Sequence, residues 1–163
     1  KIWDIDKIDE DLVSKKINEI RIENSVPISN VCYDADGLKT FVRQSTKTGF
    51  LMDAKEFHNG GTPIRIEGGL ENFKNLKAQC YFLLAEKVKE NAVFIACRDY
   101  RKQIIEELEQ INRLPMSDEG KIALEKKKDL KDRLGRSPDF ADMLMMRMVF
   151  ELQPNVELET DWY

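Results

Sequence analysis

The sequence has only one histidine, which limits the catalytic chemistry open to it. His58 stands beside Asn59 and two glycines, and we expect an exposed loop residue without a role. A serine or cysteine nucleophile activated by a histidine base would need this residue, and no Gly-x-Ser-x-Gly elbow is present. Walker and dinucleotide-binding motifs are also missing. These absences disfavour histidine-dependent hydrolysis and nucleotide-cofactor binding.

Long apolar runs and paired cysteines are missing as well. No stretch approaches the roughly 20 apolar residues of a membrane span, so we expect no membrane partner. The cysteines are odd in number, lack metal-ligand spacing and sit in apolar contexts, which predicts reduced core thiols at Cys32, Cys80 and Cys97. The N-terminus has neither an initiator methionine nor a signal-peptide pattern, so we expect a piece of a longer, cytoplasmic chain.

The overall composition predicts one globular domain with an acidic surface and one basic strip. The chain has 163 residues, a net charge of -4, 42% hydrophobic residues and a pI near 5.2. Residues 121–136 depart from this balance, with seven basic against three acidic residues. A charge run is usually a solvated face, but this one directly precedes an acidic helix. It is therefore also a candidate DNA-backbone surface, through Lys126, Lys127, Lys128 and Arg136.

Hydrophobic spacing predicts an α/β fold, because strands alternate with helices along the chain. A long loop is expected at 57–71 and a loosely held tail at 154–163. The expected helices are 9–24, 38–46, 72–90, 100–111, 126–134 and 138–152, and the expected strands are 28–33, 50–52, 92–97 and 121–124.

Asp34 is the first candidate for chemistry, since it ends a buried strand and precedes a turn and a helix. In α/β proteins, binding and catalytic sites commonly lie at the carboxyl ends of the strands. Asp36 is expected to point elsewhere. The alternative remains open that Asp34 and Asp36 only shape a turn and cap the next helix.

The segment 135–146 holds the second pair of acids. Ser137 is expected to be an N-cap, Pro138 the first helical residue, and Asp139 a favourable acid at the positive end of the helix dipole. Asp142 lies on the same face and is followed by a nearly continuous apolar run, where a carboxylate is costly to bury unless it is paired. A divalent metal ion is one possible partner, and acids from a strand end and a helix start can meet around magnesium or manganese. Two such ions support phosphodiester cleavage.

Three segments, 31–38, 72–81 and 134–144, occur in an order that resembles the C-terminal nuclease domain of the large terminase subunit of tailed bacteriophages or prophages. The resemblance implies a ribonuclease H-like (RuvC-type) mixed sheet flanked by helices. It implies a metal-dependent endonuclease that cuts concatemeric viral DNA during genome packaging in the bacterial cytoplasm. The implied partners are double-stranded DNA, a packaging ATPase domain, a portal and a small terminase subunit.

The family's site holds three carboxylates and two divalent ions, Mg²⁺ or Mn²⁺. By resemblance Asp34 takes the place of the second acid and Asp142 that of the third. Asp139 stands where some members have a further metal-site residue, and Lys127 matches a lysine typical of the family.

The sequence departs from the family because the first acid, on the first strand, is not found. We therefore expect residues 1–153 to be a nuclease domain truncated at its N-terminus, with impaired cleavage. One alternative is a noncatalytic docking module for the portal or the small terminase subunit. Another is a different ribonuclease H-like enzyme, such as a Holliday-junction resolvase or a transposase.

Overall fold

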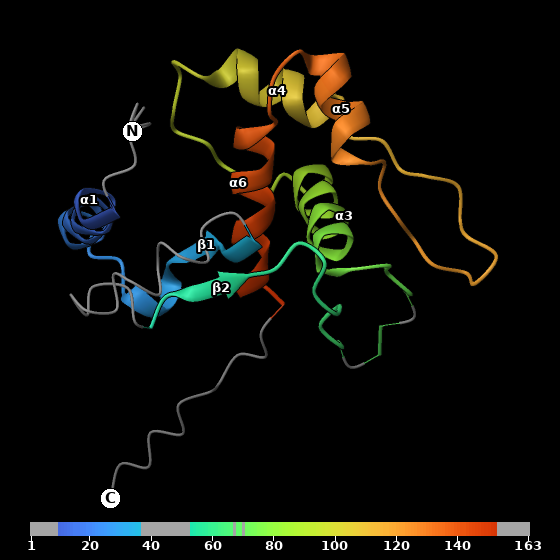
Figure 1. Cartoon of the computed structure of the whole chain (residues 1–163), viewed down its shortest axis with the longest axis horizontal. Helices are drawn as coiled ribbons and strands as arrows, with labels where there is room; N and C mark the ends of the chain where they lie inside the picture. The colour runs from blue at the N-terminus through green and yellow to red at the C-terminus, as the bar shows by residue number, and fades with distance from the viewer. Residues whose placement is uncertain (1–9, 37–52, 67, 70, 153–163) are drawn as a thin grey trace, which may run out of the picture. The chain divides into compact units, whose positions relative to one another are not determined.

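The computed structural model describes residues 10–36, 53–66, 68–69 and 71–152 (Figure 1). The chain divides into two compact units. The first unit comprises residues 1–59 and the second residues 60–163. The predicted helix 38–46, strand 50–52 and tail 154–163 lie outside the described residues.

The described residues of the first unit form an α-helix and a small parallel sheet. Helix α1 (Glu10–Glu23) confirms the predicted amphipathic helix. Strand β1 (Cys32–Asp34) pairs in parallel with β2 (Lys55–Phe57), and Asp34 lies opposite Phe57 in the register. The predicted strand 28–33 is wrong in its first half, where Ile28–Asn30 form a 3-10 turn (η1). The extended Pro27 opens this turn by accepting the Asn30 backbone N–H, which takes that amide away from a sheet ladder.

The second unit is built on helices. Helices α3 (Leu76–Lys89) and α4 (Arg101–Glu109) both pack on α6 (Asp139–Arg147), which continues as a 3-10 turn, η2 (Met148–Phe150). Helix α5 (Lys127–Leu134) confirms the predicted basic helix. The apolar residues that bury this packing include Leu76, Ala78, Cys80, Tyr81, Leu84, Ile104, Ala141, Met145, Met148 and Val149.

Two predicted strands of this unit are wrong. Residues 92–97 have no sheet pairing among the described residues, and the Phe94 side chain is 91% exposed. Residues 121–124 contribute only isolated bridges, Ile122 with Phe73 and Leu124 with Arg113. Apolar runs of this length become strands only where a neighbouring edge accepts their backbone groups. The described residues thus form an α/β arrangement with one two-stranded parallel sheet, smaller than the mixed sheet expected.

The exposed position of 92–97 also corrects one cysteine. Cys80 is buried and Cys32 half-buried, whereas Cys97 is exposed, so it is not the core thiol that its apolar neighbours predicted. Among the described residues, every helix is too short or too polar to cross a membrane.

Gly135 ends α5 in the left-handed region, with φ 71° and its N–H donated to the Lys131 carbonyl. A Cβ at Gly135 would meet no atom within 4 Å, so only backbone strain would oppose a side chain. Gly135→Ala is expected to lower the free energy of unfolding by about 1 kcal/mol in urea denaturation. Gly60→Ala is the control, because it has equal space and no positive φ. An equal loss in both variants would contradict this account.

Candidate functional site

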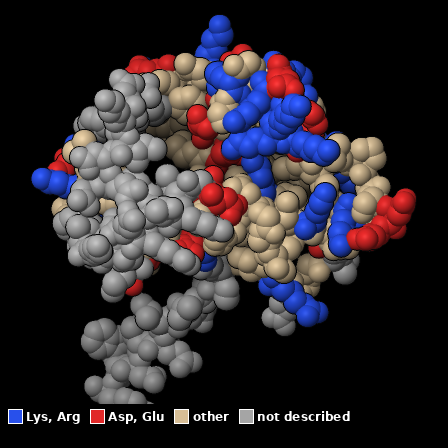
Figure 2. All heavy atoms as spheres, in the orientation of Figure 1, with Lys and Arg blue, Asp and Glu red and all other residues tan. Residues whose placement is uncertain are grey.

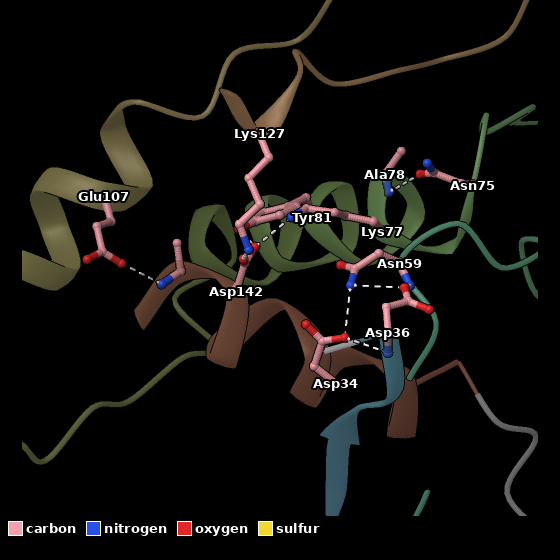
Figure 3. A network of polar contacts seen from close by, with 11 residues as sticks. Asp34, Asp36, Asn59, Asn75, Lys77, Ala78, Tyr81, Glu107, Lys127 and Asp142 are labelled. Atoms are coloured by element: carbon pink, nitrogen blue, oxygen red, sulfur yellow. Dashed lines mark hydrogen bonds and ion pairs between the residues drawn. The ribbon is translucent and has the colours of Figure 1, made fainter. Parts of the chain in front are cut away.

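Asp142 lies in the first turn of α6 and is only 9% exposed. Its Oδ1 accepts hydrogen bonds from Lys77 Nζ at 2.7 Å and from the Tyr81 hydroxyl at 2.8 Å. Its Oδ2 accepts one from Lys127 Nζ at 2.6 Å. Figure 3 shows the three donors converging on the carboxylate from α3 and from the start of α5. Two lysines and a tyrosine therefore satisfy the acid that the sequence marked as costly to bury.

The charge state of this cluster follows from its contacts. Burial alone would raise the pKa of Asp142, but the Lys77 charge and the hydrogen bonds from Lys127, Lys77 and Tyr81 outweigh it and hold that pKa below its ordinary value. Burial, followed by the Asp142 charge, raises the pKa of the Tyr81 hydroxyl well above its ordinary value. Asp142 is thus an ionised acceptor, and Tyr81 is a neutral donor.

Lys77 and Tyr81 were not singled out by the sequence reasoning, although a usable signal was present. They are four residues apart in α3 and therefore share one helix face. The Lys77 ammonium also lies 5.6 Å from the centre of the Tyr81 ring. A lysine and a tyrosine together on an otherwise apolar face indicate a buried acceptor in a neighbouring element.

The start of α6 differs from the prediction. The N-cap is Pro138 rather than Ser137, and no side chain at that position caps the helix. The Ala141 backbone N–H is accepted instead by Glu107 Oε2, at 2.9 Å, from α4 (Figure 3). Glu107 is fully buried. A free helix amide can be satisfied from any part of the chain, and this donor and acceptor are 34 residues apart, beyond the reach of local capping rules.

Arg136 completes this arrangement. Its guanidinium binds the Glu107 carboxylate and lies 2.9 Å from Glu106 Oε2. Arg136 thereby compensates the buried Glu107 charge beside the first turn of α6. Its predicted contact with DNA stays a prediction.

The other predicted DNA-binding residues cluster at the start of α5. Lys126 is the N-cap, and Lys127 and Lys128 are the first helical residues; all three are exposed. Figure 2 shows basic side chains gathered over this part of the second unit. The predicted basic strip is therefore a real surface feature, and one member, Lys127, also binds Asp142. Asp139 is exposed on the first turn of α6.

In the first unit, Asp34 and Asp36 belong to one hydrogen-bonded network (Figure 3). Asp34 Oδ1 accepts the Asp36 backbone N–H at 3.0 Å, which is the turn-shaping role left open for this residue. The Asn59 side-chain amide donates to Asp34 Oδ1 at 3.2 Å and to Asp36 Oδ2 at 3.3 Å. The expectation that Asp36 points elsewhere is wrong, because Asn59 joins the two acids. Asn59 was missed, since nothing in the sequence shows that β2 brings it to the end of β1.

His58 is partly exposed, with 44% of its side chain accessible, and it is not without contacts. Its Nδ1 lies 3.1 Å from Asp36 Oδ1 and its Nε2 lies 3.4 Å from Glu56 Oε2. The Tyr33 hydroxyl donates to Glu56 Oε1 at 2.9 Å. The single histidine thus stands between two carboxylates.

These contacts set the expected titration of His58. The hydrogen bond to Asp36 raises the pKa of His58 above its ordinary value, and Glu56 adds to the effect. The pair therefore stabilises the fold below the unfolded pKa of about 6.5, and this stability is lost as pH rises through the higher folded value. NMR titration should show the raised pKa, with a larger fall in Asp36→Asn than in Glu56→Gln. An unchanged pKa in Asp36→Asn would contradict the contact.

Whether these residues can bind a metal ion depends on the ligand atoms that their side chains offer. The described residues contain no group of three or more His, Cys, Asp or Glu side chains that could hold one. A carboxylate offers about four acceptor sites. Asp142 uses two on Oδ1 and one on Oδ2 for the bonds above, so it has room to supply one further ligand bond. Asp34 and Asp142 lie in different units, and their predicted sharing of a metal site stays a prediction.

No protein-family model and no curated protein matches the chain. Three of the solved structures that match are of the nuclease domain of the large terminase subunit of bacterial virus Sf6. The domain without a named ligand aligns with TM-score 0.62 and 24% identity, over 83% of this chain and 70% of that one. A lysine-to-alanine mutant with manganese aligns with TM-score 0.65 and 23% identity, over 83% and 71%. The same mutant with manganese and β-thujaplicinol gives TM-score 0.66 and 23% identity, over 91% and 76%. The predicted resemblance to terminase nuclease domains is therefore confirmed at the level of the fold.

Proposed function

We propose that this chain is most of a terminase-type nuclease domain, with a ribonuclease H-like fold, that cuts double-stranded viral DNA during genome packaging. The observation that carries the proposal is the pairing of Asp142 with Lys77 and Lys127 at the predicted motif, in a chain whose fold matches Sf6 terminase nuclease domains. An ionised acid beside lysines suits a site where a cation and a phosphodiester meet.

In this proposal Asp34 and Asp142 supply carboxylate ligands to Mg²⁺ or Mn²⁺, and Asp139 has a supporting role. Manganese accompanies two of the Sf6 nuclease structures and calcium a third, which supports a divalent cation here. A bound cation would polarise the phosphodiester and lower the pKa of a coordinated water. Lys77 and Lys127 keep Asp142 ionised and fix its orientation through their hydrogen bonds.

The proposal also covers the wider assembly. A further acid would complete the site, and without it this chain is expected to bind metal weakly and cut slowly. The packaging ATPase domain, portal and small terminase subunit are the proposed partners, in the cytoplasm of a bacterial host.

Nicking of supercoiled plasmid DNA in excess manganese tests the proposal. Slow, chelator-sensitive nicking is expected for the wild type, with loss of at least tenfold in Asp142→Asn. Asp118→Asn is the control and should retain most of the activity, since Asp118 is an exposed acid to which the proposal gives no role. Nicking that survives unchanged in Asp142→Asn would contradict the role of Asp142.

A noncatalytic docking module is the second candidate. It is favoured by the three protein hydrogen bonds that Asp142 already accepts, from Lys77, Tyr81 and Lys127. Calorimetric titration with manganese separates the two. Heat that disappears in Asp142→Ala supports the nuclease, whereas no heat in the wild type supports the docking module.

A further inference from the structure

A pocket of about 300 Å³ lies in the second unit, where the start of α3 and the start of α5 approach each other. Its apolar floor includes Ile111, Leu124 and Leu130. Four lysines line it, two from each helix start, together with the polar side chains of Asn75 and Tyr81: Lys74, Lys77, Lys126 and Lys127.

The charges around this pocket do not cancel. Lys77 and Lys127 are paired with Asp142. Lys74 and Lys126 are exposed, and no ion pair holds either of them within the part of the chain that the structure describes. These two ammonium groups therefore remain to attract an anion.

The one acid in the pocket lining, Glu125, is already compensated. Arg133 binds its two carboxylate oxygens at 2.9 and 2.5 Å. The hydrogen bond from Arg133 also holds the pKa of Glu125 below its ordinary value, although burial opposes this. The negative charge of Glu125 is thus compensated by Arg133 and does not offset the positive charges of Lys74 and Lys126.

The local backbone adds to the positive potential. The first turn of α3 has no acidic residue, although the Asn75 side chain caps its Ala78 N–H, and α5 has no side-chain cap at Lys126, although Asp129 lies in its first turn. Helix starts carry partial positive charge on their free amides, which here supplements the lysines.

We propose that this pocket binds a phosphate group of the DNA backbone, through Lys74 and Lys126 on either side. The proposal rests on the proposed function and adds α3 residues to the predicted DNA-binding surface. A DNA strand is favoured over free phosphate, because α5 carries the further exposed lysines Lys128 and Lys131 beyond the pocket, interspersed with Asp129 and Asp132. An extended polyanion can use such a row of charges, and a single small anion cannot.

Fluorescence anisotropy of a labelled duplex oligonucleotide, with a chelator present to prevent cleavage, tests this pocket. The double variant Lys74→Gln/Lys126→Gln is expected to bind about tenfold more weakly, with a salt-dependence slope smaller by about 1. Lys77 and Lys127 are left intact because they hold Asp142. Lys87→Gln/Lys89→Gln, at the other end of α3, makes the same change in net charge and should weaken binding less than about threefold.

The outcomes separate the pocket from the proposed function. Equal weakening in both double variants, or none in the pocket variant, would overturn the pocket while leaving DNA binding by the chain intact. Absence of wild-type binding to duplex DNA would overturn the pocket and the DNA-binding part of the proposed function together. A parallel titration with inorganic phosphate tests whether the pocket is a site for small anions. Saturable binding of phosphate without binding of the duplex would also overturn the proposal. Matching thermal melts would exclude unfolding as the cause.

Discussion

Replacing Glu107 with alanine is expected to lower the free energy of unfolding by about 3 kcal/mol, since it removes a buried carboxylate that caps α6 and pairs with Arg136, whose side chain is 37% exposed. Glu107 is fully buried, binds Arg136 and accepts the Ala141 backbone N–H. Without Glu107 the Arg136 guanidinium loses its buried partner and the first turn of α6 loses its cap. Urea denaturation of the two proteins measures the difference.

Glu106→Ala is the matched control for this prediction. Glu106 is the neighbouring residue on α4 and also binds Arg136, but its side chain is 52% exposed. An exposed pair contributes little, so a loss below about 1 kcal/mol is expected. Similar losses in the two variants would show that Glu107 does not act as a buried cap.

Asp142→Ala is expected to have the second-largest effect, a loss of about 2 kcal/mol of stability at neutral pH. Lys77 and the Tyr81 hydroxyl would lose the acceptor that they share in a mostly buried position. The value is below that for Glu107, because Glu107 also accepts the buried Ala141 backbone N–H, whereas Lys127 is 42% exposed and can turn to water. Nuclease activity is expected to fall as well, through loss of the proposed metal ligand.

The pH dependence of this loss identifies its origin. The pKa of Asp142 is lower in the folded protein than its ordinary value. Its contribution is therefore fully present above the unfolded pKa of about 3.9 and is lost as pH falls through the lower folded value. The stability difference from wild type should shrink in that acidic range. Asp139→Ala serves as the control, and a pH-independent difference in Asp142→Ala would contradict the ion-pair account.

Local sequence patterns predict the positions of several helices well. Helices α1, α4 and α5 lie within one or two residues of the expected bounds, because their apolar spacing and end signals are local. The sequence also indicates correctly that Asp142 needs a partner, since a carboxylate beside an apolar run is costly to bury alone.

The partners themselves could not be predicted. Lys77 lies 65 residues from Asp142 in the chain, and Glu107 lies 34 residues from Ala141. Such pairs form only when helices pack, and no spacing rule reaches across those distances. The sequence suggests a metal ion as the partner of Asp142, whereas the structure places two lysines and a tyrosine on its carboxylate.

For the segment 92–97, local pattern predicts a strand that the described structure does not contain. Its composition is that of a buried strand, yet Phe94 has the most exposed large apolar side chain in the described part of the chain. Strand propensity describes how residues fit a sheet surface, and it does not supply the neighbouring strand. Local pattern was therefore sufficient for helices and insufficient for the sheet.

Manganese-induced broadening of backbone amide NMR signals tests the central claim most directly. The claim is that Asp34 and Asp142 act on one divalent ion. It predicts that amides at 32–36 and at 141–143 broaden together at the same manganese concentration, and that Asp142→Asn reduces the broadening in both segments. Broadening at 32–36 that is unchanged in Asp142→Asn, or broadening of neither segment in the wild type, would contradict a shared metal site.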